Sequence, residues 1–133
     1  MTITIEQYFG SKPHTEDQRE NAVYLLGKVN ALLVFKCWKY PVDPDTGTSI
    51  SGSKGGAGDG GFRLPISTTG ASNSKHKMAR AIDVYDPEGE LDYLITDELL
   101  QVYGLYREHP DMTIGWTHLQ DVAPGSGNRT FIP

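Results

Sequence analysis

The sequence has little of several things that would otherwise define its class, and cysteine is the first. It contains one cysteine, Cys37, which excludes an internal disulfide framework of the kind that holds small secreted proteins together. Cys37 follows an apolar stretch, so we expect its thiol to be buried as a small hydrophobic group. Basic residues are also scarce: 12 lysines and arginines face 17 acidic residues, a formal net charge of -5. This balance disfavours a general nucleic-acid binder, and we expect no nucleic-acid partner.

Long hydrophobic runs are missing as well. The longest apolar run, ALLVF at residues 31–35, is far too short to cross a bilayer. The stretch MTITIEQYFG at residues 1–10 lacks the basic start and the apolar centre of a signal peptide. We therefore expect no signal peptide and no membrane insertion.

What the sequence does contain is typical of a globular protein. Of its 133 residues, 38% are hydrophobic and 22% are charged, which is enough apolar material for a modest core. We find no internal repeat and no linker that divides the chain. The expectation is a single domain over residues 1–133.

The clearest secondary-structure signal is a long helix predicted over residues 15–38. Thr15 and Gln18 form a capping-box pattern at its start. Pro41 and the turn-rich DPDTG at residues 43–47 are expected to end it. Apolar residues recur with the helical period and predict one buried face: Ala22, Leu25, Leu26, Val29, Leu32 and Leu33.

The second half of the chain predicts strands with a short helix between them. ARAIDVY at residues 79–85 and TIGWTHLQDV at residues 113–122 have strand composition. DELLQVY at residues 97–103 reads as a helix that Thr96 caps and Gly104 ends. The order of elements predicts an α+β fold, a small antiparallel sheet packed against one long N-terminal helix and a short second helix.

A glycine-dense segment, SGSKGGAGDGG at residues 51–61, precedes the first predicted strand. It lacks the GK[ST] ending and the strand-loop-helix context of a phosphate-binding P-loop. We expect a flexible surface loop there, of undefined role.

Two histidines and an aspartate form the candidate chemical site. On a strand, residues two apart share a face, so Asp83 and His118 converge if their strands are neighbours. His76, just before the first strand, can reach the same point. Two imidazoles and one carboxylate are a ligand set that zinc accepts, with a fourth position left for water. The alternatives are a half-buried histidine with one hydrogen bond, or a metal-free site in which the three groups bond only to one another.

Three motifs carry a resemblance to a known family. SKHKMARAID at residues 74–83 resembles the Ser-x-His-x-x-Gly-x-Ala-x-Asp signature of the D-Ala-D-Ala carboxypeptidase and hedgehog-type zinc peptidases. GFRLP at residues 61–65 resembles the Gly-Tyr-Arg-Ser-Pro segment of that family, and WTH at residues 116–118 resembles its Trp-x-His motif. The C-terminal residues 117–133 also resemble those of bacteriophage proteins that carry the signature. The resemblance covers about half of the chain.

The resemblance implies a role for each matching residue. His76, Asp83 and His118 would be the ligands of one Zn²⁺. Arg63 would be a catalytic and substrate-binding residue that steadies the substrate carbonyl or the oxyanion formed from it, and Ser74 would hydrogen-bond the peptide. Gln120 and Trp116, which share the strand face of the last histidine, are further candidates for substrate binding.

The sequence departs from the family pattern at two places. Ala79 replaces the signature glycine, which is tolerated unless the backbone there needs a positive φ. The two positions where members carry the catalytic carboxylate hold Gly115 and Gln120, and neither can take a proton from water. Glu108 and Asp111 are the remaining acidic candidates nearby. Glu108 is the predicted catalytic base, with a solvated loop glutamate as the alternative.

The function implied by the resemblance is hydrolysis of amide bonds in the stem peptides of bacterial peptidoglycan by a phage-derived zinc peptidase. Arg63, Lys75 and Lys77 would suit the carboxylates of these peptides. Such a protein would reside in the host cytoplasm or in a virion before it reaches the cell wall. The alternative is a zinc-binding structural or interaction module of the same fold that has lost its general base.

Overall fold

The computed structural model describes residues 1–52, 59–71 and 73–133. The predicted surface loop at residues 51–61 falls largely on residues 53–58, which lie outside the described residues. The elements, in chain order, are α1 (Ile5–Phe9), α2 (Glu16–Phe35), the short 3₁₀ helix η1 (Lys75–Met78), β1 (Ala81–Tyr85), α3 (Glu90–Leu94), α4 (Asp97–Tyr103), β2 (Tyr106–Glu108), the 3₁₀ helix η2 (Pro110–Met112), β3 (Trp116–Gln120) and β4 (Thr130–Phe131).

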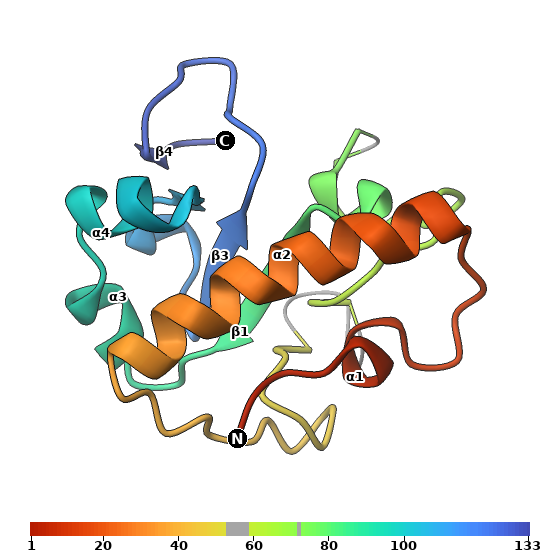
Figure 1. The fold of residues 1–133 in the computed structure, drawn as a ribbon, viewed down its shortest axis with the longest axis horizontal. Coiled ribbons are helices and arrows are strands. Elements are labelled where there is room, and N and C mark those ends of the chain that lie inside the picture. The colour runs from red at the N-terminus through yellow and green to blue at the C-terminus, as the bar shows by residue number, and fades with distance from the viewer. Residues whose placement is uncertain (53–58, 72) are drawn as a thin grey trace.

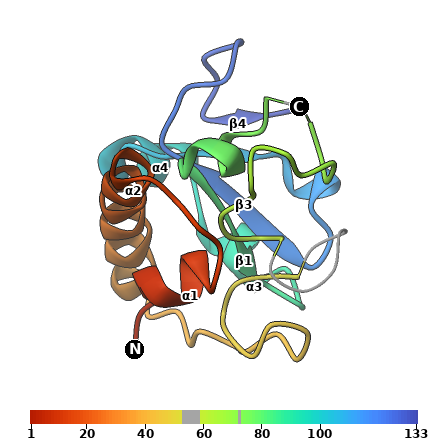
Figure 2. The ribbon, with the colours of Figure 1, turned by 90° about the vertical axis from the view of Figure 1, so that its right-hand side faces the viewer.

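The strands form one four-stranded sheet in the order β1-β3-β2-β4, and α2 covers one face of it (Figures 1 and 2). β3 pairs antiparallel with both β1 and β2, whereas β4 pairs parallel with β2. The α+β prediction is confirmed, with one parallel pair at the edge of a sheet that was predicted to be antiparallel. β2 was not predicted, because we expected a loop there.

α2 begins as predicted and ends earlier than predicted. Thr15 and Gln18 form the reciprocal capping box, and all six apolar residues of the predicted face are buried. The helix ends at Phe35 because Cys37 adopts a left-handed φ of 55° and the Trp38 N–H donates back to the Leu33 carbonyl at 2.9 Å. None of the helices that the structure describes is long and apolar enough to cross a membrane.

This helix end corrects the prediction for Cys37. The thiol is exposed, not buried. The left-handed residue that follows a helix turns the chain away from the helix axis, so the apolar period that ends at Leu33 does not extend to Cys37.

The predicted second helix is confirmed as α4. The Thr96 hydroxyl accepts a hydrogen bond from the Leu99 N–H at 3.2 Å, and Gly104 ends the helix with a left-handed φ of 69°. The two predicted strands are shorter than expected. β1 starts only at Ala81 because Ala79 takes a φ of 57°, and β3 starts at Trp116, after Gly115 with a φ of 97°.

The core lies between α2 and the sheet. Leu25 and Leu32 of α2 and Ile82, Val84 and Leu119 of the sheet are all fully buried and belong to one hydrophobic cluster. Ile82 and Val84 alternate with Asp83 along β1, so the core holds one side of this strand while the carboxylate faces the other.

Candidate metal centre

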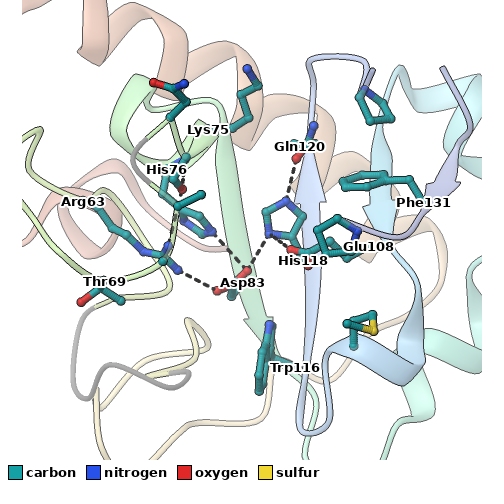
Figure 3. Close-up of a pocket in the computed structure, with 17 residues that line it drawn as sticks. Arg63, Thr69, Lys75, His76, Asp83, Glu108, Trp116, His118, Gln120 and Phe131 are labelled. Atoms are coloured by element: carbon teal, nitrogen blue, oxygen red, sulfur yellow. Dashed lines mark hydrogen bonds and ion pairs between the residues drawn. The ribbon is translucent and has the colours of Figure 1, made fainter. Parts of the chain in front are cut away.

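The pairing of β1 with β3 places Asp83 directly opposite His118. His76 lies on η1, immediately before β1, and its ring points at the same carboxylate (Figure 3). One ligand atom from each of the three residues lies within 4.8 Å of the other two, and all three residues are buried. The structure therefore brings together the three residues that the sequence analysis predicted to converge.

His76 is held by the turn that carries it. The Ser74 hydroxyl caps η1 and accepts from the His76 N–H at 3.2 Å. The Nδ1 of His76 lies 2.9 Å from the Gly61 carbonyl oxygen and its Nε2 lies 3.3 Å from Asp83 Oδ1. A glycine is needed at this position, because a Cβ on residue 61 would lie 2.5 Å from the Tyr8 carbonyl oxygen. An Nδ1–H that donates to the carbonyl leaves the Nε2 lone pair facing the centre.

His118 faces the centre with Nδ1, whereas His76 faces it with Nε2. Its Nδ1 lies 2.9 Å from Asp83 Oδ1, and its Nε2 lies 2.8 Å from the Oε1 of Gln120. The Nε2 of Gln120 in turn donates to the Val122 carbonyl at 2.7 Å. The carbonyls of Gly61 and Val122 are supports that the sequence analysis missed, since a backbone oxygen leaves no signal in residue identity.

The electrostatics of the centre favour a cation. Burial raises the pKa of Asp83, but the charge of His76 and hydrogen bonds with both imidazoles outweigh it and hold the pKa well below its usual range. Burial lowers the pKa of His118, but its hydrogen bond with Asp83 and the charges of Asp83 and Glu108 raise it overall. The centre is thus built around an ionised carboxylate that is 2% exposed.

These residues could hold a metal ion. The set offers two imidazole nitrogens and one carboxylate oxygen, all buried, in a space where a single ion can touch each of them. Each imidazole is fixed through its second nitrogen, to the Gly61 carbonyl in one case and to Gln120 in the other. Metal-ligating histidines in proteins are held in this way by a carbonyl, carboxylate or similar partner.

Glu108 lies beside this centre, on a strand rather than in a loop. Antiparallel pairing of β2 with β3 aligns Arg107 with Leu119 and thereby brings Glu108 next to His118. Glu108 Oε2 is 3.1 Å from the Nδ1 of His118, and its side chain is 21% exposed. The other acidic candidate, Asp111, is 88% exposed and pairs with His109 instead. The alternative of a solvated loop glutamate is therefore wrong for Glu108.

Arg63 and Ser74 join the centre from the side of His76. The guanidinium of Arg63 is buried; its Nε donates to the Asp59 carbonyl at 2.7 Å, and one terminal nitrogen lies 3.5 Å from Asp83 Oδ2. Its other terminal nitrogen lies 3.5 Å from the Ser74 hydroxyl. The backbone joins the same pieces, because the Arg63 N–H donates to the His76 carbonyl at 3.2 Å.

A cavity of about 380 Å³ opens over the centre. Its lining includes the three candidate ligands and, around them, Arg63, Ser74, Glu108, Trp116 and Phe131 (Figure 3). Gln120 also borders it, with both ends of its amide bonded to the protein. The cavity therefore gives a peptide-sized group access to the open side of the centre, with a cation, a carboxylate and apolar rings in its walls.

Comparisons of the chain with protein-family models, with curated proteins and with solved structures gave no match. The likeness to zinc peptidases consequently depends on the three motifs themselves, and membership of that family stays a prediction.

Proposed function

We propose that the protein is a zinc-dependent peptidase that hydrolyses amide bonds in the stem peptides of bacterial peptidoglycan, as a D-Ala-D-Ala carboxypeptidase or an L-alanyl-D-glutamate endopeptidase, and is of phage origin. The observation that carries this proposal is Glu108. Its carboxylate lies 3.1 Å from a nitrogen of the three-residue cluster and at the wall of the cavity. A proton acceptor in this place is what a hydrolase needs and a purely structural zinc site does not.

Zinc is the proposed ion because two imidazoles and one carboxylate form the open ligand set of catalytic zinc sites. Held by these residues, zinc would lower the pKa of a bound water to about 7 and would polarise the substrate carbonyl. Cysteine takes no part, since the one thiol of the chain is exposed just after the end of α2 and is not among the residues that line the cavity.

Side chains around the centre would carry out proton transfer, stabilise the oxyanion and bind the peptide. Glu108 would accept the proton of the attacking water and return it to the leaving amine, at the cavity wall where its carboxylate already lies. Arg63, fixed by the Asp59 carbonyl and by Asp83, would present its remaining N–H groups to the oxygen on which charge develops. Ser74 and Trp116 would contact the peptide from the walls of the cavity.

The chemistry of the cavity also supports the substrate class. Arg63 and Lys75 are the cationic side chains in the described part of its lining. Peptidoglycan stem peptides are short and end in carboxylates, which such cations attract.

The second candidate is a zinc-binding module without turnover. It is favoured by Gly115 and Gln120, which stand where the family carries its carboxylate. The two candidates differ in one property, since both require the metal but only the peptidase requires Glu108.

The test compares Glu108→Gln with Asp111→Asn on zinc-loaded protein. Asp111 is the matched control, a nearby carboxylate that is 88% exposed and pairs with His109. Product release from peptidoglycan fragments would be followed by chromatography, and zinc content by elemental analysis. Glu108→Gln should cut kcat at least roughly a hundredfold, while Asp111→Asn should match the parent.

Each outcome separates the candidates. Equal rates for Glu108→Gln and the parent would reject Glu108 as the base. A parent that holds about one zinc per chain but releases nothing from any fragment would favour the binding module. Both candidate functions would be rejected if His76→Ala still binds zinc. They would also be rejected if the parent binds no zinc.

A further inference from the structure

Gln120 is tied into the centre more tightly than a substrate-binding residue needs to be. It follows His118 by two positions on β3, so the two side chains share a face of the sheet. Gln120 is 4% exposed. Its Oε1 is 2.8 Å from His118 Nε2, and its Nε2 donates to the Val122 carbonyl at 2.7 Å. Both ends of the amide are therefore used inside the protein.

These two contacts fix the orientation of the amide and, through it, the imidazole. The Val122 carbonyl can only accept, so the NH₂ end of Gln120 must face it and the oxygen must face His118. An oxygen can only accept in turn, so the proton of the ring is placed on Nε2. The Nδ1 of His118, which lies 2.9 Å from Asp83 and 3.1 Å from Glu108, is then the nitrogen that gives up its proton when a cation binds.

We propose that Gln120 is a positioning residue of the metal centre: it holds His118 so that Nδ1, and not Nε2, faces the ion. The side chain does this without a charge. A carboxylate at the same place would add a third negative group to a buried centre that already holds Asp83 and Glu108. Val122 anchors the amide by its backbone, so the stretch that follows β3 is part of the support.

This inference depends on the metal site of the proposed function but not on peptidase activity. The ring nitrogen of His118 that binds the ion, and the affinity for the ion, can both be measured on protein that has no peptidase activity. Second-sphere partners of this kind contribute about 10–100-fold to metal affinity.

The experiment uses cadmium-113 as the probe ion and protein labelled with nitrogen-15 in histidine. In the parent, the metal–nitrogen coupling should appear on Nδ1 of His118 and Nε2 of His76. Gln120→Met, which keeps length but offers no comparable acceptor, should weaken zinc binding by about 10–100-fold and lose or move the His118 coupling. Gln120→Glu keeps an acceptor for the Nε2–H of His118 but cannot donate to the Val122 carbonyl, so it should retain the parent coupling and bind zinc more weakly than the parent but more tightly than Gln120→Met.

Asn30→Leu is the matched control. Its amide is also bonded at both ends, to the N–H and the carbonyl of Ile3 at 2.9 Å each, and its oxygen also accepts from the Tyr40 hydroxyl at 3.3 Å, so its described partners lie outside the centre. Asn30→Leu should lower the thermal midpoint and leave the affinity and couplings unchanged. A second measurement needs no variant: the Nε2–H of His118 should exchange slowly with solvent in the metal-loaded parent.

The outcomes separate this inference from the proposed function. Parent-like affinity and an unchanged His118 coupling in Gln120→Met would overturn the positioning role alone. So would an equal loss of affinity in Asn30→Leu, or rapid exchange of the His118 Nε2–H. A parent that binds neither cadmium nor zinc would overturn the metal site, and the positioning role with it.

Discussion

Replacing Ala79 by glycine tests the turn between η1 and β1, which brings His76 and Asp83 together. Ala79 ends η1 with a φ of 57° and a ψ of 36°, a left-handed conformation in which the chain turns from the 3₁₀ helix into β1. It is fully buried and packs in the hydrophobic core. Alanine is tolerated at this position of the signature unless the backbone needs a positive φ, and Ala79 does adopt one.

The magnitude follows from three opposing effects. An L-residue in the left-handed region costs about 1–2 kcal/mol, which glycine would relieve. Loss of one buried methyl group costs about 0.8 kcal/mol. The greater freedom of glycine in the unfolded chain costs about 0.4–1 kcal/mol more. The sum is near zero, so Ala79→Gly should change the free energy of unfolding by less than about 1 kcal/mol.

Ala22→Gly is the control that shows this balance. Ala22 is equally buried but lies within α2, where no strain is relieved. Ala22→Gly should lower the free energy of unfolding by about 2 kcal/mol, because a buried methyl group is lost and glycine has a low helix propensity. The assay is urea unfolding of metal-free protein, followed by tryptophan fluorescence and compared at equal m-values. A loss of about 2 kcal/mol in Ala79→Gly as well would refute the strain argument.

Two further perturbations address charge. Burial, only partly offset by the hydrogen bond from Thr117, raises the pKa of Asp92 to about 6. The folded protein thus holds a proton that the unfolded chain releases, and the free energy of unfolding should fall as pH rises from about 4 to about 6. Asp92→Asn should flatten that slope in urea titrations at several pH values; an unchanged slope would contradict the assignment. Arg63→Lys should lower kcat/KM on peptidoglycan fragments by about 100-fold, because one ammonium cannot reach both Asp83 and the substrate oxygen. A variant whose kcat/KM stays within threefold of the parent, a difference of about 0.65 kcal/mol in barrier height, would show that Arg63 has no part in catalysis.

Much of the fold follows from local patterns. The helical period and the capping box of Thr15 predict α2, and Thr96 with Gly104 predicts α4 to the residue. Alternation along the strands also predicts that Asp83 and His118 leave the core side and meet if their strands pair. These predictions succeed because each depends on residues within one element.

The features that were missed depend on tertiary contacts. β2 has three residues, too few to show an alternating pattern, so Glu108 appeared to lie in a loop. The end of α2 depends on a left-handed residue that is not glycine, and this placed Cys37 outside the core. The bond between Gln120 and His118 requires a side-chain orientation that residue type does not reveal.

The distance along the chain between the candidate ligands has a kinetic consequence. Asp83 and His118 are 35 positions apart, and the pairing of β1 with β3 brings them together. Closing such a loop is entropically costly and belongs to the slow, non-local part of folding. The polypeptide must therefore reach this strand pairing before an ion can be captured by all three donors. A higher ion concentration should therefore lower the unfolding rate and leave the folding rate unchanged.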